Sequence, residues 1–587
     1  MPNRYQAPLT LIRLALNQAA ENSGAHALTG YREVLADLAA PVLENAARFA
    51  AEVLSPLNPV GDRNPARCES KQVSTPPGFI EAYRRFRADG WVSLAAPEEY
   101  GGQGLPTLIA AAVTEMWGGA NSAFAMCPAL TVGALEALKV HGSADLLHTY
   151  AARLASGEWA TAMCLTEPQA GSDLSTVRTV AKPDGAGWRL FGRKIFISWG
   201  DHDLTDNIVH FVLARTPDAP PGVKGISLFL VPKNIPASDG SLTKNDIDAV
   251  SVEHKMGIRA SPTCVMMLGE RGGAQGWLVG RLHNGLGGMF TMMNHMRLGV
   301  GLHSLGLAER ALQLSRDYAH ERLQGRNLQG AQRPIIEHAD VRRMLLTMKA
   351  LIQAARGVVY TAAATLDVAH SAHDEAKRAA AARRVSLLTP IAKAWVADVA
   401  VEVASLGVQT HGGMGFVDDA EISQVYRDAR VGPIFEGTNY IQAQDLLSRK
   451  VIRDRGAELG ELLAEIEATM SGEGRSPAHA RLRSGVIENC ARLASAVAQI
   501  IDRSAAEPER VGATAYAFLQ WMGDLTGGWQ LALAASRAAT GPDTGAARAL
   551  DDIANFYATH ILPRTQAYEA IVREGTAAVS QASLSDL

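Results

Sequence analysis

Cysteine is scarce in this sequence: the 587 residues contain five, and no two of them form a Cys-x-x-Cys pair. A scattered, odd set of thiols is typical of a reducing compartment and argues against a disulfide framework or a paired-cysteine metal site. There is no run of about 18 consecutive apolar residues, and no basic N-terminal region followed by an apolar stretch. These absences predict a cytoplasmic protein with neither a secretory signal nor a membrane span.

An excess of one charge is also lacking, since the formal net charge is −4. Such a balance gives no strong attraction for nucleic acid or anionic membranes. The GxxxxGK[ST], HExxH and GxSxG motifs are all missing. The segment GVGLHS, from Gly299, nearly matches the dinucleotide fingerprint, but a serine takes the third glycine position and the surroundings read as helical. The sequence therefore gives no support to NAD-binding, kinase, hydrolase or metalloenzyme functions, and we expect no metal.

What the chain does contain is an ordered change from helical to strand-like segments. Apolar residues at three- and four-residue spacing, as in YREVLADLAAPVLENAARF, predict helices over residues 1–160. Short Val-, Ile- and Phe-rich runs such as NIVHFVLAR predict an antiparallel sheet or barrel over 161–280. Long helices return over 281–455, and TMSGEGRSPAHAR reads as a linker within an Ala-rich helical region, 456–587. We predict an α+β protein with these four domains.

A polar turn follows the first predicted strand. In LTEPQAGSD, Thr166 ends the strand-like run, and small residues lead through Ser172 to Asp173. Hydroxyls and backbone N–H groups at such a turn suit a polar ligand or a phosphate. A hairpin turn with an Asp cap explains the same residues, so this segment alone leaves both interpretations open.

The strand KIFISWGD has a similar ambiguity. Phe196, Ser198 and Gly200 alternate with Ile197 and Trp199, so one face carries a ring, a hydroxyl and a gap. That face would suit a flat cofactor, and it would equally suit ordinary strand packing.

Two charged residues stand among apolar neighbours. Arg297 lies in the helical run MMNHMRLGVG, where burial would demand an anionic or carbonyl partner, for example an ion pair with Glu309 or Asp317. Glu436 lies in RVGPIFEGTNYIQ, between an aromatic residue and a glycine. A carboxylate there is either a solvated surface group or a group placed to take a proton.

In their order along the chain, LTEPQAGSD, KIFISWG, YAHERLQGR, QTHGGMGF and FEGTNYIQ resemble the motifs of the acyl-CoA dehydrogenase family, over residues 80–450. TAMCLTEPQAGSDL, KGISLFLVPK, GWLVG and the additional C-terminal helices resemble a longer bacterial branch, which includes 3-methylthiopropanoyl-CoA dehydrogenases and broad-range fatty acyl-CoA enzymes. The resemblance implies a helical domain, a middle β-barrel and a helical bundle, with FAD between the last two.

The resemblance also implies a set of site residues. Thr166 and Ser198 would hydrogen-bond to the flavin ring, Phe196 would pack beside it, and Ser172 would contact the cofactor and the CoA chain. The remaining positions that match cofactor contacts are Arg322, Gln324, His338, Gln409, Gly413 and Thr438. Several of these contacts cross a subunit boundary in the family, so the site would need at least a homodimer. The positions that match the substrate pocket are Asn294, Arg297, Gly437 and Ser172.

Glu436 aligns with the catalytic base of the family. The implied reaction is α,β-dehydrogenation of a saturated acyl-CoA to the trans-2-enoyl-CoA, in which Glu436 removes the α-proton and a hydride passes from the β-carbon to flavin N5. Apolar neighbours should raise the pKa of Glu436, and Gly437 leaves room for the thioester. The implied substrates are 3-methylthiopropanoyl-CoA or a fatty acyl-CoA, and the implied acceptor is an electron-transfer flavoprotein.

Three alternatives remain at this point. The first is an acyl-CoA oxidase that passes electrons to oxygen, and the second is a flavoprotein of the same fold that binds DNA. The third is a scaffold with an empty flavin site. The DNA-binding alternative is the weakest, because the region beyond Gly456 has no lysine and has more Asp and Glu than Arg.

Overall fold

The computed structural model describes residues 4–237, 239–326, 330–471, 476–540, 543–583 and 585. The predicted linker therefore includes residues outside the described part, 472–475. The chain divides into two compact units, which we call the helical unit (Met1–Arg48, Pro106–Gly119 and Arg297–Leu587) and the mixed unit (Phe49–Leu105 and Ala120–Met296). Helices α5 (Thr107–His141) and α7 (Gly285–Glu321) each pass through a boundary between the units.

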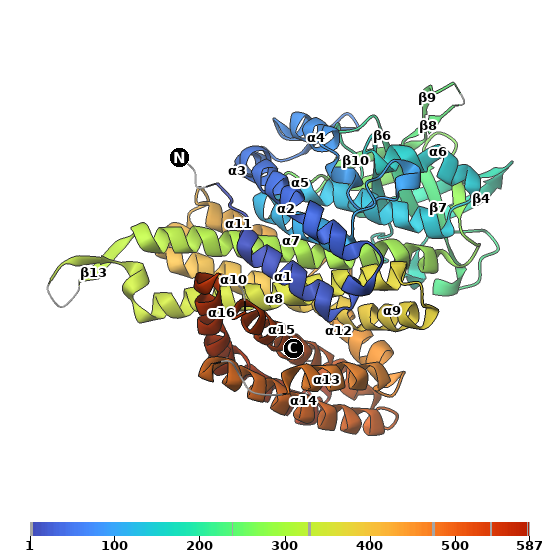
Figure 1. The fold of residues 1–587 in the computed structure, drawn as a ribbon. Helices are drawn as coiled ribbons and strands as arrows, with labels where there is room; N and C mark the ends of the chain where they lie inside the picture. Colours follow the sequence, from blue (N-terminus) through green and yellow to red (C-terminus); the bar gives the residue numbers. More distant parts are fainter. Residues whose placement is uncertain are drawn as a thin grey trace. The chain divides into compact units, whose positions relative to one another are not determined.

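The helical unit is built from long and short helices of the first and last parts of the chain (Figure 1). They are α1 (Leu9–Asn22), α2 (Tyr31–Phe49), α8 (Ala339–Ser371), α9 (Glu375–Pro390), α10 (Val396–His411), α11 (Glu421–Ala429), α12 (Asn439–Gln444), α13 (Ala457–Met470), α14 (Pro477–Arg503), α15 (Pro508–Ala538), α16 (Thr544–Phe556), α17 (Arg564–Glu574) and α18 (Thr576–Ser580). One strand pair, β13 (Leu323–Arg326) with β14 (Gln332–Pro334), follows α7. Helices α13–α18, coloured orange to dark red, belong to the same compact unit as α8 and α10.

The mixed unit holds most of the strands and three further helices. The helices are α3 (Ser55–Arg63), α4 (Phe79–Ala88) and α6 (Ala144–Ala155). The strands of the main sheet are β3 (Trp159–Cys164), β4 (Val180–Asp184), β5 (Gly187–Ser198), β6 (Asn207–Arg215), β7 (Ile226–Pro232), β10 (Ile247–Val252), β11 (Thr263–Leu268) and β12 (Ala274–Val279). The small pairs are β1 (Arg67–Glu69) with β2 (Gln72–Ser74), and β8 (Asn234–Pro236) with β9 (Leu242–Lys244).

The main sheet has the order β10-β11-β5-β12-β7-β6-β3, and β4 pairs with β5 and β6. Most pairs are antiparallel, as predicted, but β3 and β4 each run parallel to β6. The difference has a topological cause: a parallel neighbour needs a long crossover, and β4 and β5 lie in the connection from β3 to β6. Among the described pairings β10 and β3 end the strand path, so we describe a sheet here and not a closed barrel.

The sheet core is apolar on both faces. Eight of the nine residues of NIVHFVLAR in β6, and all residues of β3 and β7, are buried. Fully buried strands read as continuous Val, Ile and Leu runs without alternation. Four of the five cysteines are also buried, and all five are free thiols.

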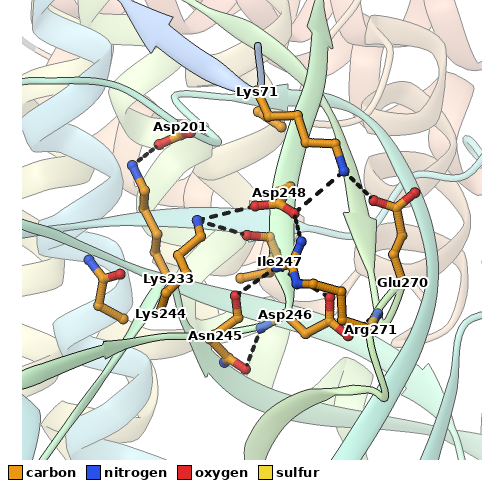
Figure 2. Close-up of polar contacts among 12 residues, drawn as sticks. Lys71, Asp201, Lys233, Lys244, Asn245, Asp246, Ile247, Asp248, Glu270 and Arg271 are labelled. Carbon is orange, nitrogen blue, oxygen red and sulfur yellow. Dashed lines mark hydrogen bonds and ion pairs between the residues drawn. The ribbon is translucent and has the colours of Figure 1, made fainter.

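A charged cluster covers β10, the strand at one end of the path (Figure 2). Asp248 is 7% exposed and accepts from Arg271 at 2.6 Å, with Lys244 at 3.2 Å and Lys71 at 3.7 Å. Lys71 also pairs with Glu270 at 2.6 Å. Although burial raises the pKa of Asp248, hydrogen bonds from Arg271 and Lys244 hold it below its usual value. Charges on an end strand disfavour pairing with the edge of another sheet.

Helix α5 is long and apolar enough to cross a membrane by length and composition. Within the fold, however, 72% of its most apolar 18-residue window is buried. A long apolar core helix passes the same test, so this helix by itself is weak support for a membrane span.

Candidate active site

Glu436 lies in the loop between α11 and α12, in an unusual backbone conformation. Glu436 has φ 57° and Gly437 has φ 82°, so two successive residues adopt the left-handed region. A non-glycine residue there is uncommon and is held by its surroundings, often at functional sites. The side-chain amide of Gln442 donates to the carbonyl of Glu436 at 3.3 Å. A Cβ at position 437 would lie 2.8 Å from that amide nitrogen, so glycine is required both by conformation and by space.

The same loop is closed by backbone and capping hydrogen bonds. The N–H of Asn439 donates to the carbonyl of Pro433 at 2.9 Å. Thr438 caps α12, because its hydroxyl accepts from the N–H of Ile441 at 3.3 Å. Thr438, predicted as a cofactor contact, therefore stabilises the end of the loop that carries Glu436.

Lys393 is a buried cation beneath this loop. It lies in the π-helical turn η8 (Ile391–Trp395) between α9 and α10, and it is 0% exposed. Its ammonium donates to the carbonyl of Gly437 at 2.8 Å and to Oδ1 of Asn439 at 2.9 Å. The amide of Asn439 in turn donates to the carbonyl of Ala394 at 2.9 Å. The lysine thus ties the loop to the helical bundle.

Glu436 is half-buried, and its carboxyl group lies under the influence of two cations. Burial raises the pKa of Glu436 to about 7, against the lowering effects of Arg297 and Lys393. Burial likewise lowers the pKa of Lys393 to about 7, opposed by Glu436. The direction for Glu436 is the one expected from the sequence. A carboxyl group poised near neutral pH is suited to take up a proton.

The partners of Arg297 differ from the ion pairs suggested by the sequence. Arg297 lies on α7 and is 9% exposed, and the carboxylates that act on it are those of Asp445 and Glu436. Glu309 accepts from Arg356 at 3.0 Å instead. Asn294 is exposed one turn earlier on the same helix. Arg297, Gly437 and Glu436, which were predicted as one site, are therefore close together.

In the mixed unit, the end of β5 presents an exposed aromatic ring. Phe196 is 59% exposed and has φ 58°, and the register of the neighbouring strand shifts between Cys264 and Met266. Ser198 is half-buried and Ile197 is buried, so the expected alternation is present over residues 196–198, whereas Gly200 is buried beyond the end of β5. The bulge turns a flat apolar surface outward.

The turn after β3 is fixed beside this ring. The carbonyl of Thr166 accepts from the N–H of Ile195 at 2.9 Å, next to Phe196 in the chain. Buried Lys194 donates to the carbonyl of Leu165 at 3.0 Å and to Glu167 at 2.8 Å. The backbone of Thr166 is thus hydrogen-bonded next to Phe196, and Ser198 lies two residues further along β5.

The state of Glu167 agrees with a permanent ion pair. Burial raises the pKa of Glu167. Lys194 and hydrogen bonds from Thr179 outweigh this effect and lower the pKa to about 2. Ser172 lies further along the turn and is exposed, and Asp173 caps the short helix that follows through the N–H of Ser175 at 2.8 Å. Both readings of this turn are therefore compatible with the structure: it has an Asp cap and it leaves a hydroxyl exposed.

The other predicted cofactor residues lie elsewhere in the helical unit. His338 hydrogen-bonds to the carbonyl of Gln324 at 2.9 Å and to Arg333 at 2.8 Å, and Arg322 and Gln324 are exposed on the β13–β14 hairpin. Figure 1 shows this hairpin projecting from the end of α7. The 21 residues that separate Arg297 from Tyr318 on α7 correspond to about 30 Å of helix. The hairpin residues are therefore far from Glu436 within one chain.

Gln409 and Gly413 are exposed at the C-terminal end of α10. The ring of His411 stacks on Tyr318 at 4.4 Å, so this end of α10 lies beside the far end of α7. These residues therefore group with the hairpin and are separated from the Glu436 loop.

The residues present fit a flavin nucleotide. In the mixed unit, the exposed ring of Phe196 lies on β5 close in the fold to Thr166 and Ser198, two residues with hydroxyl groups, which suits a flat heterocycle with polar edges. In the helical unit, the guanidinium of the exposed Arg322 suits a pyrophosphate.

Two supporting residues were not predicted from the sequence, Lys393 and Lys194. Lys393 stands among apolar residues in IAKAW, and Lys194 directly precedes the apolar residues of IFI. A buried cation requires a partner, so these patterns contained a usable signal.

Comparison with protein families covers most of the chain. The acyl-CoA dehydrogenase N-terminal, middle and C-terminal domain models match residues 40–158, 162–270 and 283–451. A model described as acetyl-CoA dehydrogenase C-terminal like matches residues 462–583.

Individual relatives extend the same likeness. The chain is 42% identical to the 3-methylmercaptopropionyl-CoA dehydrogenase of Ruegeria pomeroyi, over 99% of this chain and 100% of that protein. It is 33% identical to the broad-specificity linear acyl-CoA dehydrogenase FadE5 of Mycobacterium tuberculosis, over 91% of each. A crystal structure of an acyl-CoA dehydrogenase from Bacillus anthracis, complexed with FAD, has the same fold, with a TM-score of 0.72 at 22% identity over 92% of this chain and 88% of that one. The chain therefore belongs to the acyl-CoA dehydrogenase family and is a flavin-dependent oxidoreductase whose cofactor is FAD.

Proposed function

We propose that Glu436 is the general base that removes the α-proton of a saturated acyl-CoA thioester. The observation that carries this proposal is the position of its carboxyl group in a loop whose burial raises its pKa to about 7, beside the cations Arg297 and Lys393. A base with a pKa near working pH is ionised for much of the time and still basic enough to take a proton. In the reaction the α-carbon gives up its proton and Glu436 holds it as a carboxylic acid.

The same site supports the negative charge that develops on the thioester. As the α-proton leaves, charge moves to the carbonyl oxygen, and Arg297 and Lys393 make the surroundings positive. Gly437 has no side chain, so the thioester has room at the loop, and the backbone N–H of Glu436 is a donor for the carbonyl oxygen. FAD, when bound, would supply the redox chemistry as the hydride acceptor for the β-hydrogen.

For the acyl group we propose 3-methylthiopropanoyl-CoA first and a fatty acyl-CoA second. The support is the name of the relative that is 42% identical over nearly the whole chain. Fatty acyl groups are supported by the broad-specificity relative at 33%. Anaerobic bleaching of the enzyme-bound flavin by a panel of acyl-CoAs ranks these substrates directly.

We further propose a homodimer in the cytoplasm, with an electron-transfer flavoprotein as acceptor. The dimer is supported by the distance between the two groups of predicted cofactor residues along α7, because one chain keeps the hairpin far from Glu436. Sedimentation of the FAD-loaded protein tests the dimer. Stoichiometric peroxide release during turnover would replace the acceptor proposal by the oxidase alternative, and salt-dependent retention on DNA would support the nucleic-acid alternative.

The test of the base is Glu436→Gln. This variant should retain bound FAD and lose at least about 10²-fold in the rate of flavin reduction by substrate, the lower range for a general base. Glu461→Gln, which changes an exposed carboxylate on α13, is the matched control and should reduce flavin at the wild-type rate. A Glu436→Gln rate within a few-fold of wild type would remove this residue from the mechanism.

A further inference from the structure

Helix α15 presents a regular stripe toward the part of the chain that carries Glu436. Four positions on it, Gly512, Tyr516, Gln520 and Asp524, are separated by four residues each. Side chains at this spacing lie on one face of a helix, one turn above another. Each of the four makes a hydrogen bond to a residue between positions 395 and 440.

The first three contacts reach α12 and α10. The hydroxyl of Tyr440, the second residue of α12, donates to the carbonyl of Gly512 at 3.2 Å. Tyr516 and Gln520 both donate to Oδ2 of Asp398, at 2.8 and 2.6 Å. Two donors from the C-terminal region thus converge on one carboxylate oxygen of the bundle.

The fourth contact anchors the turn that contains Lys393. The indole N–H of Trp395 donates to Oδ1 of Asp524 at 3.0 Å, and both residues are buried. A Cβ at Gly523 would lie 2.1 Å from the indole ring, so α15 can approach this ring closely only because it has glycine there. The C-terminal helix is therefore fitted tightly to η8.

Asp398 connects this stripe to the loop of Glu436. The side chain of Asn439 also hydrogen-bonds to Asp398, and the positive charge of Lys393 acts on it. Lys393 and Asn439 are the residues that hold the carbonyl of Gly437 and the start of α12. Hydrogen bonds from α15 to Asp398, the electrostatic interaction of Asp398 with Lys393, and the hydrogen bond from Lys393 to Gly437 therefore connect α15 to the residue after Glu436.

We propose that α15 supports the active-site loop, and that Lys393 and Asp398 are positioning residues which transmit this support to Glu436. The inference rests on the proposed function, in which Glu436 is the base. It gives the C-terminal region a task in the reaction itself, because displacing α15 would alter both the placement of the Glu436 carboxylate and the charge beside it.

The charges facing each member of this set determine the expected pH effects. Glu436 faces Arg297 on α7 and Lys393 on η8, and Lys393 faces Glu436, Arg297 and Asp398. Asp398 faces Lys393 and the hydroxyl of Tyr516. Burial raises the pKa of Asp398, and donation from Tyr516 and Gln520 opposes this rise and favours the ionised form. Ionised Asp398 favours charged Lys393, and charged Lys393 favours ionised Glu436. Weakening any step should leave Glu436 protonated up to a higher pH.

The experiment compares flavin reduction by substrate across pH in the FAD-loaded enzyme. The test variants are Lys393→Met, which removes the charge, and Tyr516→Phe combined with Gln520→Leu, which removes both donors to Asp398. We expect each to bind FAD, to lower the reduction rate by about 10-fold near neutral pH, and to move the acid limb upward by about 0.5 pH unit or more. Lys393→Arg keeps the charge, so the acid limb of its pH–rate profile should lie close to that of the wild type. Trp529→Phe is the matched control: it removes a donor of the same helix that is bonded to Thr469, and it should not move the limb.

Several outcomes decide the proposal. If the double variant of Tyr516 and Gln520 lowers thermal stability but leaves the acid limb within about 0.2 pH unit of wild type, the support is only structural and the proposal is overturned. Should Lys393→Met not fold, Tyr516→Phe alone gives the decision, since it removes a single oxygen atom. The base assignment is tested separately. An active Glu436→Gln enzyme would overturn the proposed function. If Glu436→Gln is inactive and the acid limb of the α15 variants does not move, only the present inference is overturned.

Discussion

Trp395 and Asp524 form a buried hydrogen bond at 3.0 Å between the active-site side of the bundle and the C-terminal helix α15. Burial raises the pKa of Asp524 to about 7, against the lowering effects of Arg564 and the Trp395 indole. Because the pKa of this carboxyl group differs between the folded and unfolded states, the free energy of unfolding depends on pH.

We predict that Asp524→Asn stabilises the protein at alkaline pH. The ordinary pKa of the carboxyl group is 3.8 and its folded value is about 7, so between these values the folded state keeps a proton that the unfolded state releases. The free energy of unfolding of the wild type therefore falls as pH rises through this range, and below it the effect is absent. At pH 8 the variant should be more stable by up to about 4 kcal/mol, with little gain at pH 4.

The measurement is chemical denaturation at pH 4, 6 and 8. Asp552→Asn, which removes an exposed carboxylate from the same region, is the control and should follow the wild-type curve. A gain for Asp524→Asn that is the same at all three pH values would contradict the assignment to proton uptake.

We predict that the rate of flavin reduction by substrate rises with pH and levels off above about 7. Glu436 must be ionised to take the α-proton, and burial raises its pKa to about 7. Rapid-mixing absorbance measurements across pH 5 to 9 under anaerobic conditions give this profile. An acid limb centred near the usual carboxyl value would show that Glu436 is solvated in the substrate complex.

Gly437→Ala should reduce activity more than it reduces stability. The residue has φ 82°, and the new Cβ would lie 2.8 Å from the amide of Gln442, which holds the carbonyl of Glu436. The strain is about 1–2 kcal/mol, and it acts on the loop that carries the base. Steady-state kcat and thermal unfolding are measured together.

The control for that variant is Gly460→Ala. Gly460 lies in α13 with nothing within 4 Å of its added Cβ, so alanine should be neutral or slightly stabilising there. If Gly437→Ala keeps wild-type kcat, the left-handed turn is not needed to place Glu436.

Phe196→Gly should separate flavin binding from folding. The ring is 59% exposed and its backbone is left-handed, so glycine removes little buried surface and relieves strain worth about 1 kcal/mol. The apoprotein should unfold at an equal or higher temperature, whereas its affinity for FAD should fall at least about 10-fold.

FAD titration by fluorescence and melting of the apoprotein test both halves of this prediction. Leu242→Ala, at another exposed apolar side chain in the mixed unit, is the control and should leave FAD affinity unchanged. Unaltered FAD affinity in Phe196→Gly would mean that the ring is not part of the cofactor site.

Much of this architecture was predictable, because local sequence patterns indicate the individual helices and strands. The runs NIVHFVLAR and KIFISWG become β6 and the end of β5, since β-branched and aromatic residues bounded by glycine, proline or aspartate leave few alternatives. The parallel pairing of β3 with β6 was not predictable, because it depends on which strands meet after a long connection. Sequence periodicity predicts a strand and the residues on each of its faces, but it does not predict which strand pairs with it.

The candidate site shows the same division. Glu436 and Gly437 were found from their motif, and the expected rise in the pKa of Glu436 follows from apolar neighbours. Lys393 was missed because its partners Gly437 and Asn439 lie more than 40 residues further along the chain. A lysine inside an apolar run signals that a partner exists, but only the fold identifies it.

The four-residue ladder on α15 also bears on protein engineering. A chimera that grafts the bundle of this chain onto a foreign C-terminal region would lose the partners at positions 512, 516, 520 and 524, and Tyr440, Asp398 and Trp395 would lack their hydrogen bonds to α15. Shuffling of modules in this branch of the family should therefore keep the last two segments as one exchangeable block.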